Sequence, residues 1–91
     1  MEFEWDARKA QSNLQKHRVS FIEAASAFAD SFALLTDDLD HSWDEPRKIL
    51  LGRGENGRLL VVTFTHRGAT IRLISARLAT SAEGRQYGNK G

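Results

Sequence analysis

The fold is decided by residues 47–77, RKILLGRGENGRLLVVTFTHRGATIRLISAR. Apolar and polar residues alternate along this stretch around two glycine-containing turns, which predicts three antiparallel strands. The pair Asn56-Gly57 predicts a two-residue type I′ turn, because both central positions of that turn need positive φ. The second turn is predicted at Arg67-Gly68. It is either a two-residue loop or a three-residue loop with a left-handed Gly68, which would slip the register by one.

The two-residue turns determine which side chains share a face of the sheet. One face is then entirely apolar and is the predicted core: Ile49, Leu51, Leu60, Val62, Phe64, Ile71 and Leu73. The other face mixes apolar and polar residues: Lys48, Leu50, Val61, Thr63, Thr65, Thr70, Arg72, Ile74 and Ala76. Because an antiparallel sheet can keep one face in water, the polar positions are either an ordinary solvated surface or a binding surface.

The length of 91 residues predicts one domain, which we assign to residues 1–87, with residues 88–91 as a disordered tail. A hydrophobic fraction of 41% is enough for a small core and excludes general disorder. Without cysteine there is neither a disulfide framework nor a thiolate metal site. No signal peptide or bilayer-spanning apolar run is visible, so we expect a cytoplasmic protein without membrane contact.

The net charge of +1 conceals an asymmetry between the two halves of the chain. Residues 1–45 hold four Lys or Arg and ten Asp or Glu, whereas residues 46–91 hold nine Lys or Arg and two Asp or Glu. Basic residues along a sheet suit a polyanion such as RNA, whose phosphates provide affinity without sequence information. The alternative is that the two halves neutralise each other within one fold.

The sequence outside the meander predicts helices and two short strands. Asp6 is a suitable N-cap for a helix over residues 7–17, and Ser20 with Glu23 forms a capping box for a helix over residues 21–29. A third helix is predicted at residues 78–87, and strands at residues 3–5 and 32–35. The predicted fold class is therefore α+β, with a small antiparallel sheet, two N-terminal helices on one face and a short C-terminal helix.

Residues 36–46, TDDLDHSWDEP, lack regular periodicity and are a candidate functional loop, because loops carry function more often than packed elements do. His41 titrates near neutrality and suits general acid–base work, with Glu45 or Asp44 to orient it, although it could also be a solvated surface histidine. The i, i+4 spacing of His41 and Glu45 could bind a metal on a helix, but Pro46 and the local acidity favour a loop. We predict neither a metal site nor a cofactor.

Several cationic side chains lie on or beside the predicted sheet. Arg72 falls in mid-strand, with Thr63 as its expected cross-strand neighbour, and Arg77 ends the last strand. Arginine grips phosphate through two parallel hydrogen bonds and can stabilise a phosphorane during RNA cleavage. The alternative is a role in solubility alone. Arg58 is expected to pair with Glu55 across the first turn, as a surface ion pair.

The combined pattern resembles the BrnT toxins of bacterial type II toxin–antitoxin systems, and the resemblance covers nearly the whole chain. It depends on five segments: FEWDARKAQSNLQKH at 3–17, VSFIEAASAFAD at 19–30, HSWDEPR at 41–47, GRLLVV at 57–62 and RGATIRLISAR at 67–77. The chain departs from the family pattern at three places. Arg18 replaces the usual Gly after the first helix, Pro46 precedes Arg47, and residues 81–85 replace a more basic and more helical ending.

The resemblance implies a fold similar to that of RelE-type ribonucleases and the cleavage of RNA without a metal. It also implies inhibition by a BrnA-like antitoxin, with operator DNA bound only through the toxin–antitoxin complex. Together with the resemblance, the residues above predict a catalytic set: His41, Glu45, Arg72 and Arg77. They also predict a set that contacts RNA phosphate: Arg47, Lys48, Arg53 and Ser75. The alternative function is a catalytically weak protein-binding or regulatory module that retains the toxin fold, because acid–base residues are sparse.

Overall fold

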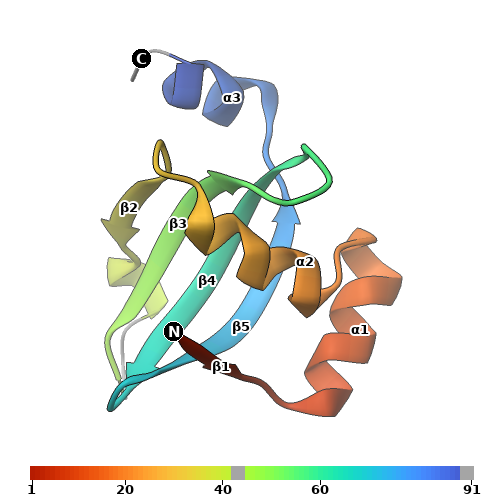
Figure 1. The fold of residues 1–91 in the computed structure, drawn as a ribbon, viewed down its shortest axis with the longest axis vertical. Helices are drawn as coiled ribbons and strands as arrows, with labels where there is room; N and C mark the ends of the chain where they lie inside the picture. The colour runs from red at the N-terminus through yellow and green to blue at the C-terminus, as the bar shows by residue number, and fades with distance from the viewer. Residues whose placement is uncertain (42–44, 89–91) are drawn as a thin grey trace.

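The computed structural model describes residues 1–41 and 45–88. Its strands are β1 (Glu2–Glu4), β2 (Leu34–Asp37), β3 (Arg47–Arg53), β4 (Leu59–Arg67) and β5 (Thr70–Leu78). Its helices are α1 (Ala7–His17), α2 (Phe21–Ser26) and α3 (Ser81–Gly88), with 3₁₀ turns η1 (Ala27–Ala29) and η2 (Leu39–His41). They form an α+β fold of one sheet and three helices (Figure 1). None of the described helices is long and apolar enough to cross a membrane.

The sheet is mixed, with strand order β1-β5-β4-β3-β2. β3, β4 and β5 form the predicted antiparallel meander, and β2 adds antiparallel to β3. β1 pairs with β5 in parallel, with Phe3 opposite Ile71, so the prediction of a purely antiparallel sheet is wrong. Such a short edge strand carries no signal for its own direction, because the path of the remaining chain decides which strand it meets.

The hairpin of β3 and β4 is shifted by one residue from the predicted register. Leu50, rather than Leu51, lies opposite Val62 and joins the core. Ile49 and Leu51 therefore lie on the opposite face, where Leu51 pairs with Val61. A shift of one residue inverts a whole strand, because successive side chains point to opposite faces.

The turn of this hairpin explains the shift. The backbone N–H of Gly57 donates to the carbonyl oxygen of Gly54 over 2.9 Å. Gly57 has a φ of +81°, whereas Asn56 does not have a positive φ. The loop is thus a four-residue turn that ends in a left-handed glycine, and the predicted type I′ turn is wrong.

The second hairpin turns at Gly68-Ala69, one residue later than predicted. Gly68 has a φ of +62° and Ala69 has no positive φ, which is the pattern of a type II′ turn. Phe64 consequently pairs with Leu73 instead of Ile71. A displacement of two residues preserves the face of every side chain, so Phe64, Ile71 and Leu73 remain in the core as predicted.

β5 contains a β-bulge at Ile74, which has no partner on β4 between the paired residues Leu73 and Ser75. The extra residue inverts the alternation along the rest of the strand. Ala76, which was predicted for the polar face, is therefore 1% exposed and belongs to the core. Arg77 lies on the opposite face.

α2 lies across one face of the sheet, whereas α1 lies beside the β5 edge (Figure 1). α2 packs Phe21 and Ala24 against the sheet, and α1 contacts β5. The buried core combines residues from this side: Val19, Phe21, Ala24, Ala27, Leu50, Leu60, Val62, Phe64, Ile71, Leu73 and Ala76. The opposite face is not covered by α2.

The ends of α1 agree with the sequence prediction. The Asp6 carboxylate accepts hydrogen bonds from the backbone N–H groups of Arg8 (2.9 Å) and Lys9 (3.1 Å). These two hydrogen bonds hold the pKa of Asp6 below its usual value, and the bond from Lys9 has the larger effect. Arg18 ends the helix with a φ of +60°, the left-handed conformation that the Gly of the family pattern would adopt at lower cost.

Only half of the predicted capping box of α2 forms. The Ser20 hydroxyl accepts from the N–H of Glu23 at 3.0 Å. The Glu23 carboxylate, however, accepts two hydrogen bonds from Arg58, at 2.6 and 2.9 Å. This pairing lowers the pKa of Glu23, and it shows that the expected Arg58–Glu55 pair is wrong.

α3 spans Ser81–Gly88 and begins three residues later than predicted. Thr80 caps it, because the Thr80 N–H donates to the Glu83 carboxylate (2.8 Å) and the Glu83 N–H donates to the Thr80 hydroxyl (3.2 Å). Of the predicted tail, Gly88 ends the helix, and residues 89–91 lie outside the described residues. The cap therefore joins α3 directly to the end of β5.

Gly57→Val should destabilise the protein by roughly 1–3 kcal/mol, because a β-branched residue is strained at positive φ. No atom lies within 4 Å of a Cβ built at Gly57, so the loss would come from the backbone alone. Gly84→Ala is the matched control, because it also meets no atom and has no positive φ. It should stabilise α3. Equal urea midpoints for the Gly57 variant and the unmodified chain would contradict the left-handed turn.

Candidate active site

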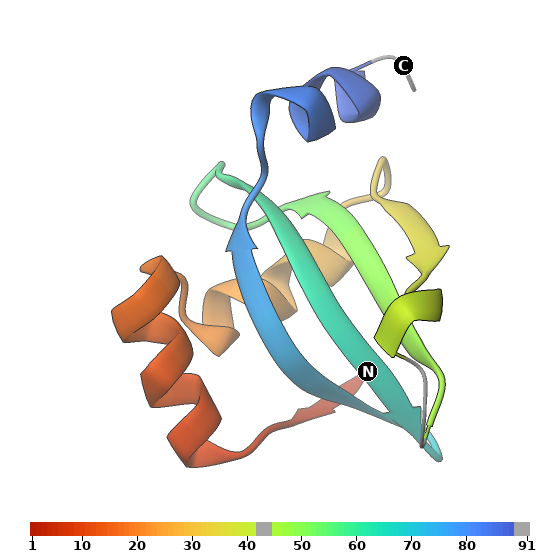
Figure 2. The ribbon, with the colours of Figure 1, turned by 180° about the vertical axis from the view of Figure 1, so that it is seen from behind.

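The candidate site lies on the sheet face opposite α2, which we call the open face (Figure 2). Residues directly opposite each other in antiparallel strands share a face. Strand pairing therefore defines three rows across β3, β4 and β5: Arg47–Thr65–Arg72, Ile49–Thr63–Ser75 and Leu51–Val61–Arg77. Four predicted site residues lie in these rows: Arg47, Arg72, Ser75 and Arg77.

A hollow of about 410 Å³ occupies the open face between the sheet and the segment around η2. Nine residues line it: Asp38, Asp40, Arg47, Ile49, Val61, Thr63, Ile74, Ser75 and Arg77. The backbone N–H of Asp38 donates to the carbonyl oxygen of Arg47 over 2.8 Å, which fastens this segment to the start of β3. The hollow thus combines two guanidinium groups, two hydroxyls and two carboxylates.

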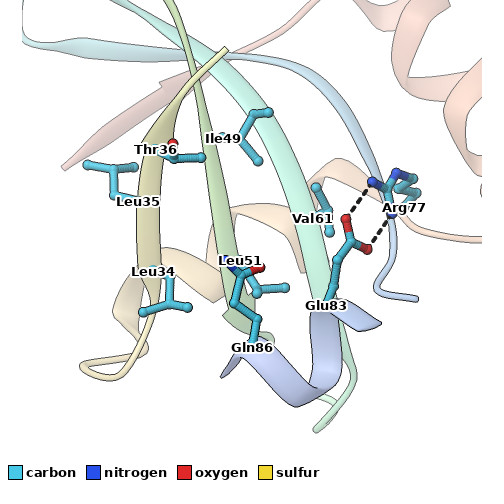
Figure 3. A pocket seen from close by; sticks show the side chains of 9 residues that line it. All are labelled: Leu34, Leu35, Thr36, Ile49, Leu51, Val61, Arg77, Glu83 and Gln86. Carbon is cyan, nitrogen blue, oxygen red and sulfur yellow. Dashed lines mark hydrogen bonds and ion pairs between the residues drawn. The ribbon is translucent and has the colours of Figure 1, made fainter. Parts of the chain in front are cut away.

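Arg77 forms a two-bond ion pair with Glu83 of α3 (Figure 3). Nη1 and Nη2 of Arg77 each donate to one carboxylate oxygen over 2.9 Å. These hydrogen bonds, followed by that from the Thr80 backbone, lower the pKa of Glu83 to about 2. The same pair raises the pKa of Arg77. The guanidinium therefore keeps a fixed direction on the open face.

Arg72 pairs with Glu4 of β1, with 2.7 Å between Nη1 and Oε2. Its side chain is 27% exposed. Its cross-strand neighbour is Thr65, not the predicted Thr63, because the second turn comes one residue later than predicted. Arg72 consequently lies at the β1 side of the open face, outside the residues that line the hollow.

The end of the acidic segment lies against the open face. Thr65 is 1% exposed, and its hydroxyl donates to the carbonyl oxygen of Pro46 over 2.6 Å. Glu45 pairs with Arg67 at 3.2 Å. His41 ends η2, and Ser42 to Asp44, which include the candidate residue Asp44, lie outside the described residues.

Two predicted phosphate contacts lie away from the hollow. Lys48 lies opposite Phe64 on the helix side of the sheet and pairs with Asp37 at 2.9 Å. Arg53 donates to the carbonyl oxygen of Gly57 (2.7 Å), and its guanidinium lies 5.3 Å from the ring centroid of Tyr87. The one-residue slip of β3 carried Lys48 to the other face, and the length of β3 separates Arg53 from Arg47.

Three residues that shape the site were not singled out from the sequence. Asp38 and Asp40 belong to the acidic segment that was identified as a loop, so composition signalled the segment but not its members. Glu83 was considered only as part of an altered C-terminal ending. The Thr80-Ser81-Ala82-Glu83 capping pattern was a usable signal for where this carboxylate points.

An apolar groove of about 260 Å³ adjoins the hollow (Figure 3). Its lining comes from β2, β3, β4 and α3, with Arg77 and Glu83 at one side: Leu34, Leu35, Thr36, Ile49, Leu51, Val61, Arg77, Glu83 and Gln86. Ile49 and Leu51, which were predicted for the core, form its floor. The open face therefore has an apolar part beside the charged hollow.

A family described as "Ribonuclease toxin, BrnT, of type II toxin-antitoxin system" matches residues 5–83 of this sequence. The chain belongs to this family. The match includes both the acidic segment and the bulged strand, so the predicted resemblance is confirmed. Membership implies an RNA target and an antitoxin partner for this BrnT-family chain.

A solved structure agrees with the fold. The ribonuclease toxin BrnT of Brucella abortus superimposes with a TM-score of 0.68 at 23% sequence identity, over 89% of this chain and 99% of that chain. At this identity the likeness supports the fold alone. A search of curated proteins gave no match.

Glu83 should titrate by NMR with a midpoint of about 2, below its ordinary value of 4.5. Since folding lowers this pKa, the pair stabilises the protein above pH 4.5, and the contribution is lost as the pH falls toward 2. Arg77→Ala should raise the midpoint toward 4.5, and the bonds from Thr80 should keep it from returning fully. Arg58→Ala, which breaks the other two-bond pair, is the control and should leave Glu83 unchanged. A normal midpoint in the unmodified chain would refute the pairing.

Proposed function

We propose that this BrnT-family chain is an endoribonuclease toxin that cleaves RNA without a metal and is neutralised by a BrnA-like antitoxin. The observation that carries the proposal is the grouping of Arg47, Ser75 and Arg77 around one hollow on the open face. Guanidinium groups can hold a phosphodiester and stabilise the charge that develops on it. In the described part of the chain, no three His, Asp or Glu side chains are arranged to hold a metal.

The proposed reaction is an internal transesterification. The ribose 2′-oxygen attacks the adjacent phosphorus, the bond from phosphorus to the 5′-oxygen breaks, and a 2′,3′-cyclic phosphate and a 5′-hydroxyl form. A base takes the proton of the 2′-hydroxyl, and an acid supplies one to the departing 5′-oxygen. His41 and Glu45 are the proposed proton carriers, and Glu45 forms an ion pair with Arg67.

Arg77, Arg47 and Ser75 are the proposed phosphate ligands. The Arg77 fork is held by Glu83, so a phosphate would bind through the remaining N–H groups or displace that carboxylate. Arg72 is proposed to bind the next phosphate or to stabilise the pentacoordinate state from the β1 side. Arg72 and Arg47 lie two strand spacings apart, on either side of β4, which corresponds to roughly 10 Å.

The partner proposals follow from the family. Type II systems pair a protein toxin with a protein antitoxin, and we propose a BrnA-like antitoxin that also carries the complex to operator DNA. The fold is proposed to be related to that of RelE-type ribonucleases, and the site of action to be the cytoplasm. A complex that restores growth and blocks RNA cleavage would support the partner assignment.

RNA cleavage by the purified chain should persist in excess EDTA and yield 2′,3′-cyclic phosphate or 3′-phosphate ends. The reason is that all proposed charge stabilisation comes from guanidinium groups. Mass spectrometry of a short oligoribonucleotide gives the end groups. Activity that disappears in EDTA and returns with magnesium would require the acidic residues Asp38 and Asp40 to be reassigned to a metal. No cleavage at all, with antitoxin binding intact, would favour the regulatory module.

Arg72→Ala should lower cleavage by roughly 10²–10³, the typical effect of losing one preorganised donor to a developing charge. The loss of its partly exposed pair with Glu4 should cost about 1 kcal/mol. Glu4→Gln is the matched control, since it breaks the same pair and leaves the guanidinium in place. Arg72→Lys should rescue only partly, because an ammonium cannot reproduce the planar fork. Equal activity losses in the Glu4 and Arg72 variants would make the pair structural.

A further inference from the structure

Asn13 of α1 has a buried amide that bonds to the backbone of β5. Its Nδ2 donates to the carbonyl oxygens of Ala76 (2.8 Å) and Val19 (2.9 Å). Its Oδ1 accepts from the backbone N–H of Ala76 at 3.0 Å. The residue is only 7% exposed. One side chain thus satisfies both backbone groups of Ala76, as a neighbouring strand would.

This part of β5 needs such a partner because no strand covers it on that side. β1 pairs with β5 only from Thr70 to Arg72. Beyond Arg72, α1 lies beside β5 in place of a strand (Figures 1 and 2). A helix has no free backbone groups along its side, so a side-chain amide has to provide the donor and the acceptor.

Ala76 lies between two proposed phosphate ligands and directly after the bulge. The bulge at Ile74 turns Ser75 and Arg77 toward the open face and Ala76 toward the core. Without the extra residue, strict alternation would place Ser75 and Arg77 on the same side as Leu73, in the core. The backbone of Ala76 is therefore where the orientation of both ligands is fixed.

We propose that Asn13 is a positioning residue for RNA cleavage, which holds the bulged segment so that Ser75 and Arg77 face the phosphate. The inference rests on the proposed function. Asn13 itself touches no substrate, because its amide is used by the backbone of Ala76 and Val19.

The decisive variant is Asn13→Asp, which has the same shape but, when ionised, lacks the donor for the two carbonyl oxygens. It should lower kcat by about 10²-fold at neutral pH, the scale expected when reacting groups are displaced by about 1 Å. A protonated Asp carries both a donor and an acceptor, so the activity ratio of variant to unmodified chain should recover as the pH is lowered. In an Arg77→Ala background, the same substitution should lower kcat by a smaller factor than in the unmodified chain, because part of its effect acts through Arg77.

Phe28→Leu is the control for a general loss of stability. The Phe28 ring packs on Phe3 and Phe64 on the helix side, with centroids 5.1 and 4.9 Å apart, and lies away from the open face. It should lower Tm while kcat stays within about twofold of the unmodified chain, as expected for a site whose geometry is intact. The inference would be overturned if Asn13→Asp and Phe28→Leu each lost kcat in proportion to the decrease in Tm.

The Glu83 titration gives a second readout that does not need activity. Because Arg77 is the main cause of the Glu83 pKa of about 2, displacing Arg77 in Asn13→Asp should raise that pKa, whereas Phe28→Leu should not. If the unmodified chain does not cleave RNA, the proposed function fails, and this titration alone decides whether Asn13 positions Arg77. An unchanged Glu83 midpoint in Asn13→Asp would overturn the positioning role even in an active enzyme.

Discussion

The bulge at Ile74 is the constraint on which the rest of the site depends. One unpaired residue in β5 reverses the alternation, so that Ala76 fills the core while Ser75 and Arg77 reach the open face. The bulge lies where β5 leaves β1 and comes beside α1. These features are linked, because Asn13 forms its hydrogen bonds with the part of the β5 edge that β1 leaves uncovered.

The acidic and basic halves of the sequence form ion pairs with each other within the fold. Glu4, Glu23, Asp37 and Glu45 of the acidic half pair with Arg72, Arg58, Lys48 and Arg67 of the basic half. Such pairs add little stability when exposed, but they fix where cationic groups point. Neutralisation within the fold and binding of a polyanion are therefore compatible. An arginine that is held by a carboxylate at the edge of a hollow is also oriented to bind an anion.

The sequence predicted most elements because their signals are local. The N-cap of α1, the left-handed end at Arg18, the Ser20 cap and the alternation of the three strands each depend on a few neighbouring residues. The registers failed for a related reason. The candidate turn types differ in loop length by one residue. The position of Gly57 alone does not distinguish a type I′ turn from a longer loop with a left-handed glycine.

The sequence by itself determined the family, the α+β class and the basic strands that carry Arg47, Arg72, Ser75 and Arg77. Only the tertiary structure decided which face each of these side chains occupies. The direction of β1 and the pairing around the bulge of β5 involve residues far apart in the chain, whereas the slip of β3 follows from the length of its turn. The slip of β3 moved Lys48 to the helix side, whereas Arg53 lies outside the hollow because it is at the other end of β3 from Arg47. Glu83 entered the site because α3 places its carboxylate beside Arg77.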